Sequence, residues 1–245
     1  MLGRTRRPAN LNAQVIRELG MDIVSGRFAE HQILPGDTEL TDRFQVSRTV
    51  IRDAIKALAA KGIVQSRARV GTRVLARRGW NMFDSDVLSW HLQSGHDAAL
   101  VDQLAEIRMG FEPEAAALAA LRRTADDCDA IMHALENMSL SGIDAKHFAL
   151  HDLEFHKAIA HASANPFMAS ITSVVEAALS VSFTISSPVL LGEPALAQTL
   201  ALHASVANAI VERRPEDAAA AMREVIQVGI DRARVNHRES PGVPG

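Results

Sequence analysis

The chain has 245 residues, of which 47% are hydrophobic, 22% are charged and only 4% are aromatic, an ordinary balance for a soluble globular protein that leans toward helices. The single cysteine, Cys128, excludes an internal disulfide and predicts a reducing cytoplasm. The N-terminal residues lead into no signal-peptide core, and no apolar run of about 18 or more residues predicts a membrane span.

The net charge of −3 hides an uneven distribution along the chain. Residues 1–80 hold 15 of the 26 Lys and Arg residues and 7 of the 29 Asp and Glu residues, a net charge of +8. Residues 81–245 hold the other 11 and 22, a net charge of −11. A basic segment suits a polyanion such as DNA, which would repel the acidic segment. The two parts therefore have separate partners.

The first third of the chain has the pattern of a winged helix-turn-helix, predicted for residues 1–77. Apolar residues recur at helical spacing, and Ser47 is a good N-cap for a helix that Gly62 ends. The predicted elements are helices at 10–26, 37–44 and 48–61, a loop at 28–34, and two β-like runs at 63–66 and 72–75 joined by a basic loop at 67–71.

The helix predicted at 48–61 has one apolar face and one polar face. The polar face of such a helix enters the major groove, where arginine suits bidentate contact with guanine and a lysine further along meets a phosphate. Arginines of the basic hairpin would follow the DNA backbone or probe the minor groove. Alternatively, all of these are solvated surface charges. The DNA-binding candidates are Arg48, Thr49, Arg52 and Lys56 on the helix and Arg67, Arg69 and Arg73 on the hairpin.

The rest of the chain predicts a linker or junction at 78–95 and an all-helical domain at 96–238 that binds an effector and dimerises. Its segments show helical periodicity and are separated by Gly, Pro and Asn-Pro breaks. One short helix is predicted in the junction, at 84–93. The helices predicted in the domain are 97–120, 124–138, 144–163, 167–185, 193–212 and 215–236.

Four polar residues fall on apolar helix faces of this domain: Arg108, Asp152, His156 and His203. Buried polar groups are costly unless they are paired or metal-bound, so these residues are candidates for one site in the bundle core. Asp and His suit a transition metal such as zinc, and Arg suits a carboxylate. Alternatively, Arg108 pairs with Glu112, Asp152 and His156 pair with each other, and His203 is structural.

The segment LPGDTELTDRFQVSRTVIRDAIKALAAKGIVQSRARVGTRV resembles the DNA-binding domain of the GntR family. The match is strongest at the VSR-x-x-x-R core, which contains Ser47, Arg48 and Arg52. Two positions depart from the family pattern. Asp37 stands where Glu is usual, and Thr38 stands where a DNA-contacting Arg is common. The resemblance adds Thr38 and Ser47 to the DNA-binding candidates.

The later segment is similar to the FCD effector domain of the FadR subfamily of that family, so that the resemblance covers about residues 10–235. The matching features are Asp152-x-x-x-His156, then Asn165-Pro166, then His203 ahead of Ala-Ile. FCD domains are antiparallel helical bundles, and many hold a metal with one Asp and three His and bind a small carboxylic acid. The resemblance therefore implies effector-binding roles for Arg108, Asp152, His156, His203 and Asn165.

At the position of the third metal-binding His this chain has Val225, which points inward by periodicity. A three-ligand site of Asp152, His156 and His203 could still hold one divalent ion of zinc, nickel or manganese. It could equally have lost the metal and bind the effector by hydrogen bonds.

The segment WNMFDSDVLSW, residues 80–90, resembles a signature of galactonate-operon repressors within the same family. That resemblance implies a sugar-acid effector such as an aldonate. The two tryptophans are expected to pack the sensor against the DNA-binding domain, and Asp86 is expected to cap a helix.

The expected function is that of a homodimeric repressor on palindromic double-stranded operator DNA, released by a small carboxylate such as an aldonate. One alternative is a metal-dependent hydrolase-like enzyme, in which an open metal position activates water. It lacks an obvious general base or nucleophile and leaves the basic domain unexplained. The other alternative is a dimeric DNA-binding protein that needs no ligand.

Overall fold

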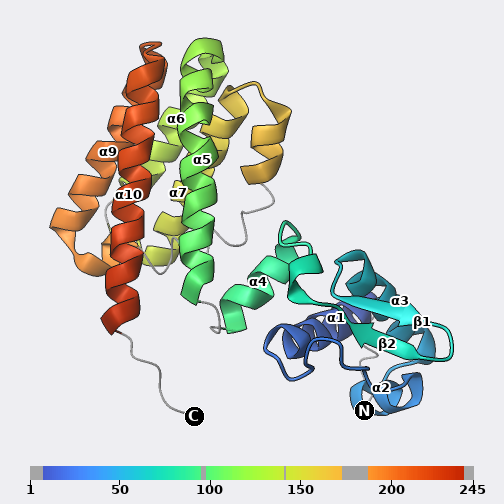
Figure 1. Ribbon diagram of the computed structural model, residues 1–245. Coiled ribbons are helices and arrows are strands. Elements are labelled where there is room, and N and C mark those ends of the chain that lie inside the picture. The colour runs from blue at the N-terminus through green and yellow to red at the C-terminus, as the bar shows by residue number, and fades with distance from the viewer. Residues whose placement is uncertain (1–7, 95–97, 141, 173–186, 240–245) are drawn as a thin grey trace, which may run out of the picture. The chain divides into compact units, whose positions relative to one another are not determined.

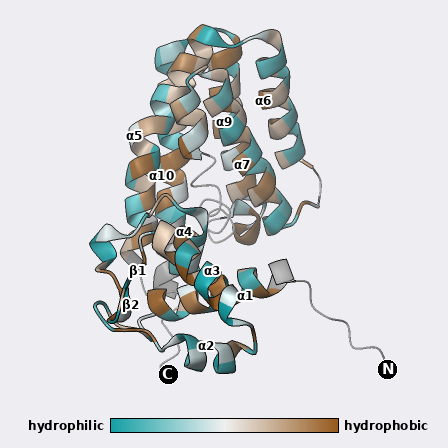
Figure 2. Cartoon of the chain, turned by 90° about the vertical axis from the view of Figure 1, so that its right-hand side faces the viewer, coloured by the Kyte–Doolittle hydropathy of each residue, from teal (hydrophilic) through white to brown (hydrophobic). Residues whose placement is uncertain are grey.

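The computed structural model describes residues 8–94, 98–140, 142–172 and 187–239. The chain forms two compact units, residues 1–97 and residues 98–245 (Figure 1). In Figure 2, apolar and polar residues alternate along the helices of both units, as expected for helices that bury one face.

Unit 1 contains three helices followed by a β-hairpin. Its core consists of apolar residues from all of these elements, among them Leu19, Ile51 and Val74. In the antiparallel hairpin, Val64 lies opposite Val74 and Arg67 lies opposite Gly71. The elements are α1 (Pro8–Val24), α2 (Asp37–Phe44), α3 (Arg48–Ala60), β1 (Val64–Arg67) and β2 (Gly71–Val74).

Residues 31–34, predicted to be part of a loop, lie alongside β2. The backbone N–H of His31 donates to the carbonyl of Val74 at 3.0 Å, and that of Leu34 donates to the carbonyl of Thr72 at 2.8 Å. An isolated bridge joins Ile33 to Arg73. This segment therefore extends the hairpin by one short edge, which the sequence pattern did not reveal.

A short helix, η1 (Arg77–Gly79), and α4 (Ser85–Ser94) complete unit 1. Trp80 and Trp90 are buried in the core of unit 1 itself, which differs from their expected role at a domain junction. α4 packs on α1. A Cβ atom at Gly20 of α1 would lie 2.3 Å from the Trp90 ring, so the glycine allows this close approach.

The junction segment also contacts the end of α3 through Lys61. Its Nζ lies 2.8 Å from one carboxylate oxygen of Asp84 and 2.8 Å from Asp86. The expectation that Asp86 caps the helix is wrong, because Asp84 accepts from the backbone N–H groups of Asp86 and Val87 at 3.1 and 3.2 Å.

Unit 2 is a helical bundle in which α5 lies beside α10, α6 beside α7 and α9 beside α10 (Figure 1). Thr124 forms a capping box at the start of α6, and Asp144 caps α7. Phe148, Phe155 and Ile226 lie in the shared core. The elements are α5 (Ala98–Arg122), α6 (Ala125–Met138), α7 (Ala145–Ala162), η2 (Pro188–Leu191), α9 (Glu193–Val211) and α10 (Pro215–Glu239).

The prediction of a mostly helical chain, with a winged helix-turn-helix followed by an antiparallel helical bundle, is confirmed. Of the helix predicted at 167–185, residues 166–172 are helical, and residues 173–185 lie outside the described part of the chain. By length and composition alone, α9 could cross a membrane. It nevertheless buries His203, Val206 and Ile210 against the other helices of the bundle.

Candidate DNA-binding surface and effector pocket

The helix α3 separates its side chains as predicted. Ile51, Ala54, Ile55 and Leu58 are buried, whereas Arg48, Thr49, Arg52 and Lys56 are exposed. The side chain of Ser47 accepts from the backbone N–H of Val50 at 3.4 Å, so it caps the helix. The polar face of α3 is thus available to a ligand outside unit 1.

Each long cation on α3 has a partner on the surface of unit 1. Arg52 Nε lies 3.0 Å from Asp37 Oδ2, and Lys56 Nζ lies 3.3 Å from Asp53 Oδ1. Arg48 Nη2 donates to Thr38 Oγ1 at 3.4 Å, so Thr38 contacts one of the DNA-binding candidates. The first turn of α2 therefore lies against the basic face of α3.

The hairpin carries the other three candidates, Arg67, Arg69 and Arg73, and all are exposed. Arg69 and Gly71 have φ angles of 63° and 105°, which close a tight basic turn. Within the described residues none of the three arginines pairs with a carboxylate; Arg67 Nε donates to the Gln65 side chain at 3.1 Å. Their positive charge is therefore not neutralised locally.

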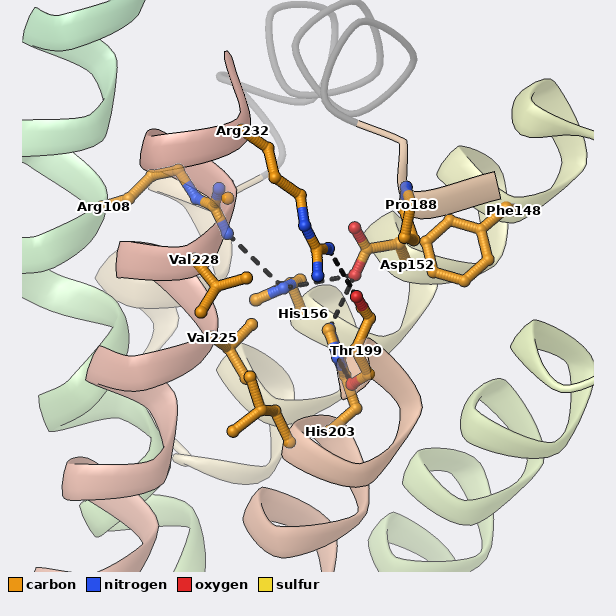
Figure 3. A pocket seen from close by; sticks show the side chains of 12 residues that line it. Arg108, Phe148, Asp152, His156, Pro188, Thr199, His203, Val225, Val228 and Arg232 are labelled. Carbon is orange, nitrogen blue, oxygen red and sulfur yellow. Dashed lines mark hydrogen bonds and ion pairs between the residues drawn. The ribbon is translucent and has the colours of Figure 1, made fainter. Parts of the chain in front are cut away.

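In unit 2, four predicted residues come together in one pocket. Arg108 is on α5, Asp152 and His156 are on α7, and His203 is on α9 (Figure 3). Their exposed fractions are 8%, 8%, 3% and 2%, so all four are buried. With the mouth that opens to solvent, the space between the lining side chains is about 420 Å³.

Glu112 links two of these residues. Its carboxylate accepts from Arg108 Nε at 2.7 Å and lies 2.8 Å from His156 Nδ1. Burial would raise the pKa of Glu112, but Arg108 and His156 outweigh it and lower the pKa from 4.5 to about 2. Burial would lower the pKa of His156, but Glu112 and Asp152 raise it from 6.5 to about 9. The alternative pairing of Arg108 with Glu112 is therefore present, within a larger network.

Asp152 and His203 form the second half of the network. His203 Nε2 lies 2.9 Å from Asp152 Oδ1, and His203 Nδ1 lies 2.8 Å from the backbone carbonyl of Thr199. A carbonyl only accepts, so Nδ1 carries a hydrogen and Nε2 faces the pocket. Burial opposes the charge on Asp152, but hydrogen bonds from His156 and His203 hold its pKa below the usual range.

The same three residues fit a divalent metal ion. Asp152, His156 and His203 each offer one ligand atom, and these atoms lie within 4.8 Å of one another. The Nδ1 atom of each imidazole faces an oxygen acceptor, Glu112 for His156 and Thr199 for His203. Metal-bound histidines are oriented in this way. Val225 is buried, lines the pocket and supplies no ligand.

Arg232 was missed by the sequence reasoning, although it lies two helical turns beyond Val225 on the same face of α10. It lines the pocket and donates to Thr199 Oγ1 and to the carbonyl of Ala195. Burial lowers the pKa of Arg232, and nearby Asp152 opposes that effect. Figure 3 shows its guanidinium directed toward the Asp152 and Thr199 side chains. The pocket thus has a second guanidinium.

Asn165, predicted to bind the effector, is not among the residues that line this pocket. It follows the C-terminus of α7, nine positions beyond His156, a rise of about 13 Å along a helix. Its side chain accepts from the backbone N–H of Phe167 at 3.0 Å. Its observed role is to cap the helical residues that follow.

Comparisons with known proteins agree with both units. The pattern of the gntR family of bacterial regulatory proteins matches residues 11–74, and that of the FCD domain matches residues 103–228. The uncharacterised HTH-type transcriptional regulator YieP of Escherichia coli (strain K12) is 32% identical over 206 residues, covering 83% of this chain and 86% of YieP. The galactonate operon transcriptional repressor of the same organism is 30% identical, covering 82% of this chain and 87% of its own.

Two further matches are more distant. The transcriptional repressor NanR of Cronobacter sakazakii is 27% identical over 91% of this chain and 86% of its own. The solved structure of Lar, which controls expression of the agr system of Listeria monocytogenes, is 18% identical. It covers 95% of this chain and all of its own with a TM-score of 0.61, which supports the fold alone. This chain therefore belongs to the GntR family of transcriptional regulators, with an FCD domain, and is not an enzyme.

Proposed function

We propose that this regulator represses an operon for the catabolism of a sugar acid or related carboxylate, and that the small acid releases it from its operator. The observation that carries this proposal is the buried polar pocket of unit 2, which places two guanidiniums beside Asp152 and two histidines. The name of the galactonate operon transcriptional repressor supports the same class of operon, and the name of NanR supports a role in repression.

Within the pocket, Arg232 binds the effector carboxylate. Among the described residues it forms no direct ion pair, whereas Arg108 is held by Glu112 at 2.7 Å. Arg108 adds a second positive charge to the same pocket, and Thr199, Asp152 and His203 offer partners for hydroxyl groups. An anionic, polyhydroxylated molecule satisfies both kinds of group.

If a zinc, nickel or manganese ion is present, Asp152, His156 and His203 would hold it. Such an ion would supply further positive charge for the effector oxygens. The imidazole orientation set by Glu112 and Thr199 serves both the metal-bound and the metal-free pocket.

The DNA partner is a palindromic double-stranded operator bound by a homodimer in the cytoplasm. Arg48, Thr49 and Arg52 read base edges from the exposed face of α3. The remaining candidates contact or flank the phosphates: Lys56, Arg67, Arg69, Arg73, Thr38 and Ser47.

The test is a thermal-shift screen of the full-length protein against aldonates, keto acids and dicarboxylates, with and without each metal. A ligand that binds the folded state raises the melting temperature by mass action. The hit should then release the protein from its promoter DNA in a mobility-shift assay. If no acid raises the melting temperature and none changes promoter binding, the protein is a ligand-independent regulator and the proposal is wrong.

A further inference from the structure

Asp37 is an acidic side chain on a surface that has to approach a polyanion. It is the first residue of α2, and its side chain is 42% exposed. Its Oδ2 atom accepts from Arg52 Nε at 3.0 Å. A carboxylate in this place repels DNA phosphates, so it weakens non-specific binding.

Asp37 contacts only the Nε atom of Arg52, so the rest of the guanidinium is free. A guanidinium has five N–H groups, and the bond to Asp37 uses only the one on Nε. The described residues give Arg52 no other polar partner. Its two terminal nitrogens therefore remain available, and together they match the O6 and N7 acceptors of guanine.

The position of Arg52 on α3 fits this use. It lies one turn beyond Arg48 on the exposed face of the helix, while the neighbouring Ile51 is buried. A free arginine would lose side-chain entropy on binding a base, and it could equally turn to a phosphate. A carboxylate on Nε fixes the plane of the guanidinium, which reduces the entropy that is lost on binding a base. It also neutralises part of the charge, which makes contact with a phosphate less favourable.

We propose that Asp37 is a positioning residue for base recognition: it holds Arg52 so that the terminal nitrogens meet a guanine in each half-site. The inference rests on the proposed role of α3 as the base-reading helix. Asp37 thus lowers the affinity for all DNA and raises the discrimination at one base pair.

Asp53 provides a matched control. It is also exposed on this helix pair, and it pairs with Lys56 at 3.3 Å and not with Arg52. Asp37→Asn and Asp53→Asn make the same change in charge. The experiment is selection from a pool of randomised duplex DNA with the full-length protein, followed by binding titrations over a range of salt concentrations. Circular dichroism checks that the variants are folded.

Both variants should bind non-specific DNA more tightly than wild type, because each removes one negative charge. Only Asp37→Asn should lose the preference for guanine at one position of each half-site, from roughly tenfold or more to less than about threefold. Asp37→Glu keeps the carboxylate and should keep the preference.

Equal guanine preference in Asp37→Asn and Asp53→Asn would overturn the inference while leaving the proposed function intact. Loss of preference in Asp37→Glu would count against the carboxylate as its cause. A wild-type protein that enriches no sequence at all would contradict the proposed function, and this inference with it.

Discussion

Arg232 is the residue of the pocket that we expect to be most important for effector binding. The helix α10 has Val225 where many FCD domains, by the resemblance described above, have a metal ligand, and two turns later it has a guanidinium. Arg108 and Arg232 therefore bring positive charge to the pocket whether or not an ion is bound. We expect this charge to be more important for effector binding than any ion.

Arg232→Gln should weaken effector binding by about 10- to 100-fold, because a charge-assisted hydrogen bond contributes about 1.5–3 kcal/mol. Operator binding without effector should not change. Calorimetry with the acid identified in the thermal-shift screen gives the comparison. Arg223→Gln removes the same charge from an exposed site on the same helix and serves as the control. Equal affinities in the two variants would remove Arg232 from the effector site.

Glu112 predicts how the stability of unit 2 depends on pH. Its pKa is lowered from 4.5 to about 2, so its stabilising contribution is present above about pH 4.5 and is lost as the pH falls toward 2. The loss is at most about 3 kcal/mol. His156, whose pKa is raised to about 9, stays protonated across this window and adds no slope there.

The measurement is urea unfolding followed by circular dichroism at about pH 6 and about pH 3. Glu112→Gln should have a lower free energy of unfolding than wild type at the higher pH. Its free energy of unfolding should also change less between the two pH values than that of wild type. The stability of Glu112→Gln should still depend on pH to some extent, because the pKa of Asp152 is also lowered. An unchanged slope in Glu112→Gln would mean that Glu112 is not the titrating group.

How far the site could be predicted differs from residue to residue. Asp152, His156, His203 and Arg108 break the apolar faces of their helices, and that local pattern is visible in the sequence. The bond between Glu112 and His156 depends on how α5 packs against α7, which no local pattern encodes. Arg232 lies within the polar C-terminal part of α10, residues 231–239, so only its spacing from Val225 could have pointed to it.

At the scale of elements, α4 is held to α1 by a large residue facing a glycine. The Trp90 ring occupies the space that a Cβ at Gly20 would need, at 2.3 Å. Gly20→Ala should therefore destabilise unit 1 by about 1–3 kcal/mol through overpacking. The higher helix propensity of alanine offsets up to about 1 kcal/mol of this loss. In a Trp90→Leu background the same substitution should be neutral or stabilising.

Tryptophan fluorescence is a selective probe here, because the chain has two tryptophans and both lie in unit 1. In the double variant, Trp80 still reports unfolding. A double-mutant cycle in urea then gives the coupling between positions 20 and 90. If Gly20→Ala has the same effect in both backgrounds, the steric account of this helix pair is wrong.

Among the elements, strongly periodic helices were predictable and unpatterned contacts were not. The predicted helix at 37–44 matches α2, and the one at 48–61 ends one residue beyond α3. The pairing of residues 31–34 with β2 has no sequence signal, because it uses backbone groups alone. Asp84 caps α4 because it directly precedes the first helical residue, Ser85, whereas Asp86 lies inside the helix.

At the scale of the whole molecule, the basic and acidic parts of the chain divide two binding tasks. Operator affinity should fall steeply as the salt concentration rises, because the basic unit neutralises DNA phosphates. Effector affinity should depend on salt far less, because charges in a buried pocket are screened less. The two tasks are joined only if the effector binds differently to the free and operator-bound protein. Their coupling can be measured from either side.

Thermodynamic linkage requires the coupling between effector and operator to be reciprocal. If the effector weakens operator binding by a given factor, the operator must weaken effector binding by the same factor, typically about 5- to 150-fold. Calorimetric titration of the effector into the free protein and into the saturated operator complex should show this ratio, and a mobility-shift titration should give the same value. A duplex with both half-sites scrambled is the control, and it should leave effector affinity unchanged. Tighter effector binding to the operator complex would make the acid a co-repressor, and the proposed release would be wrong.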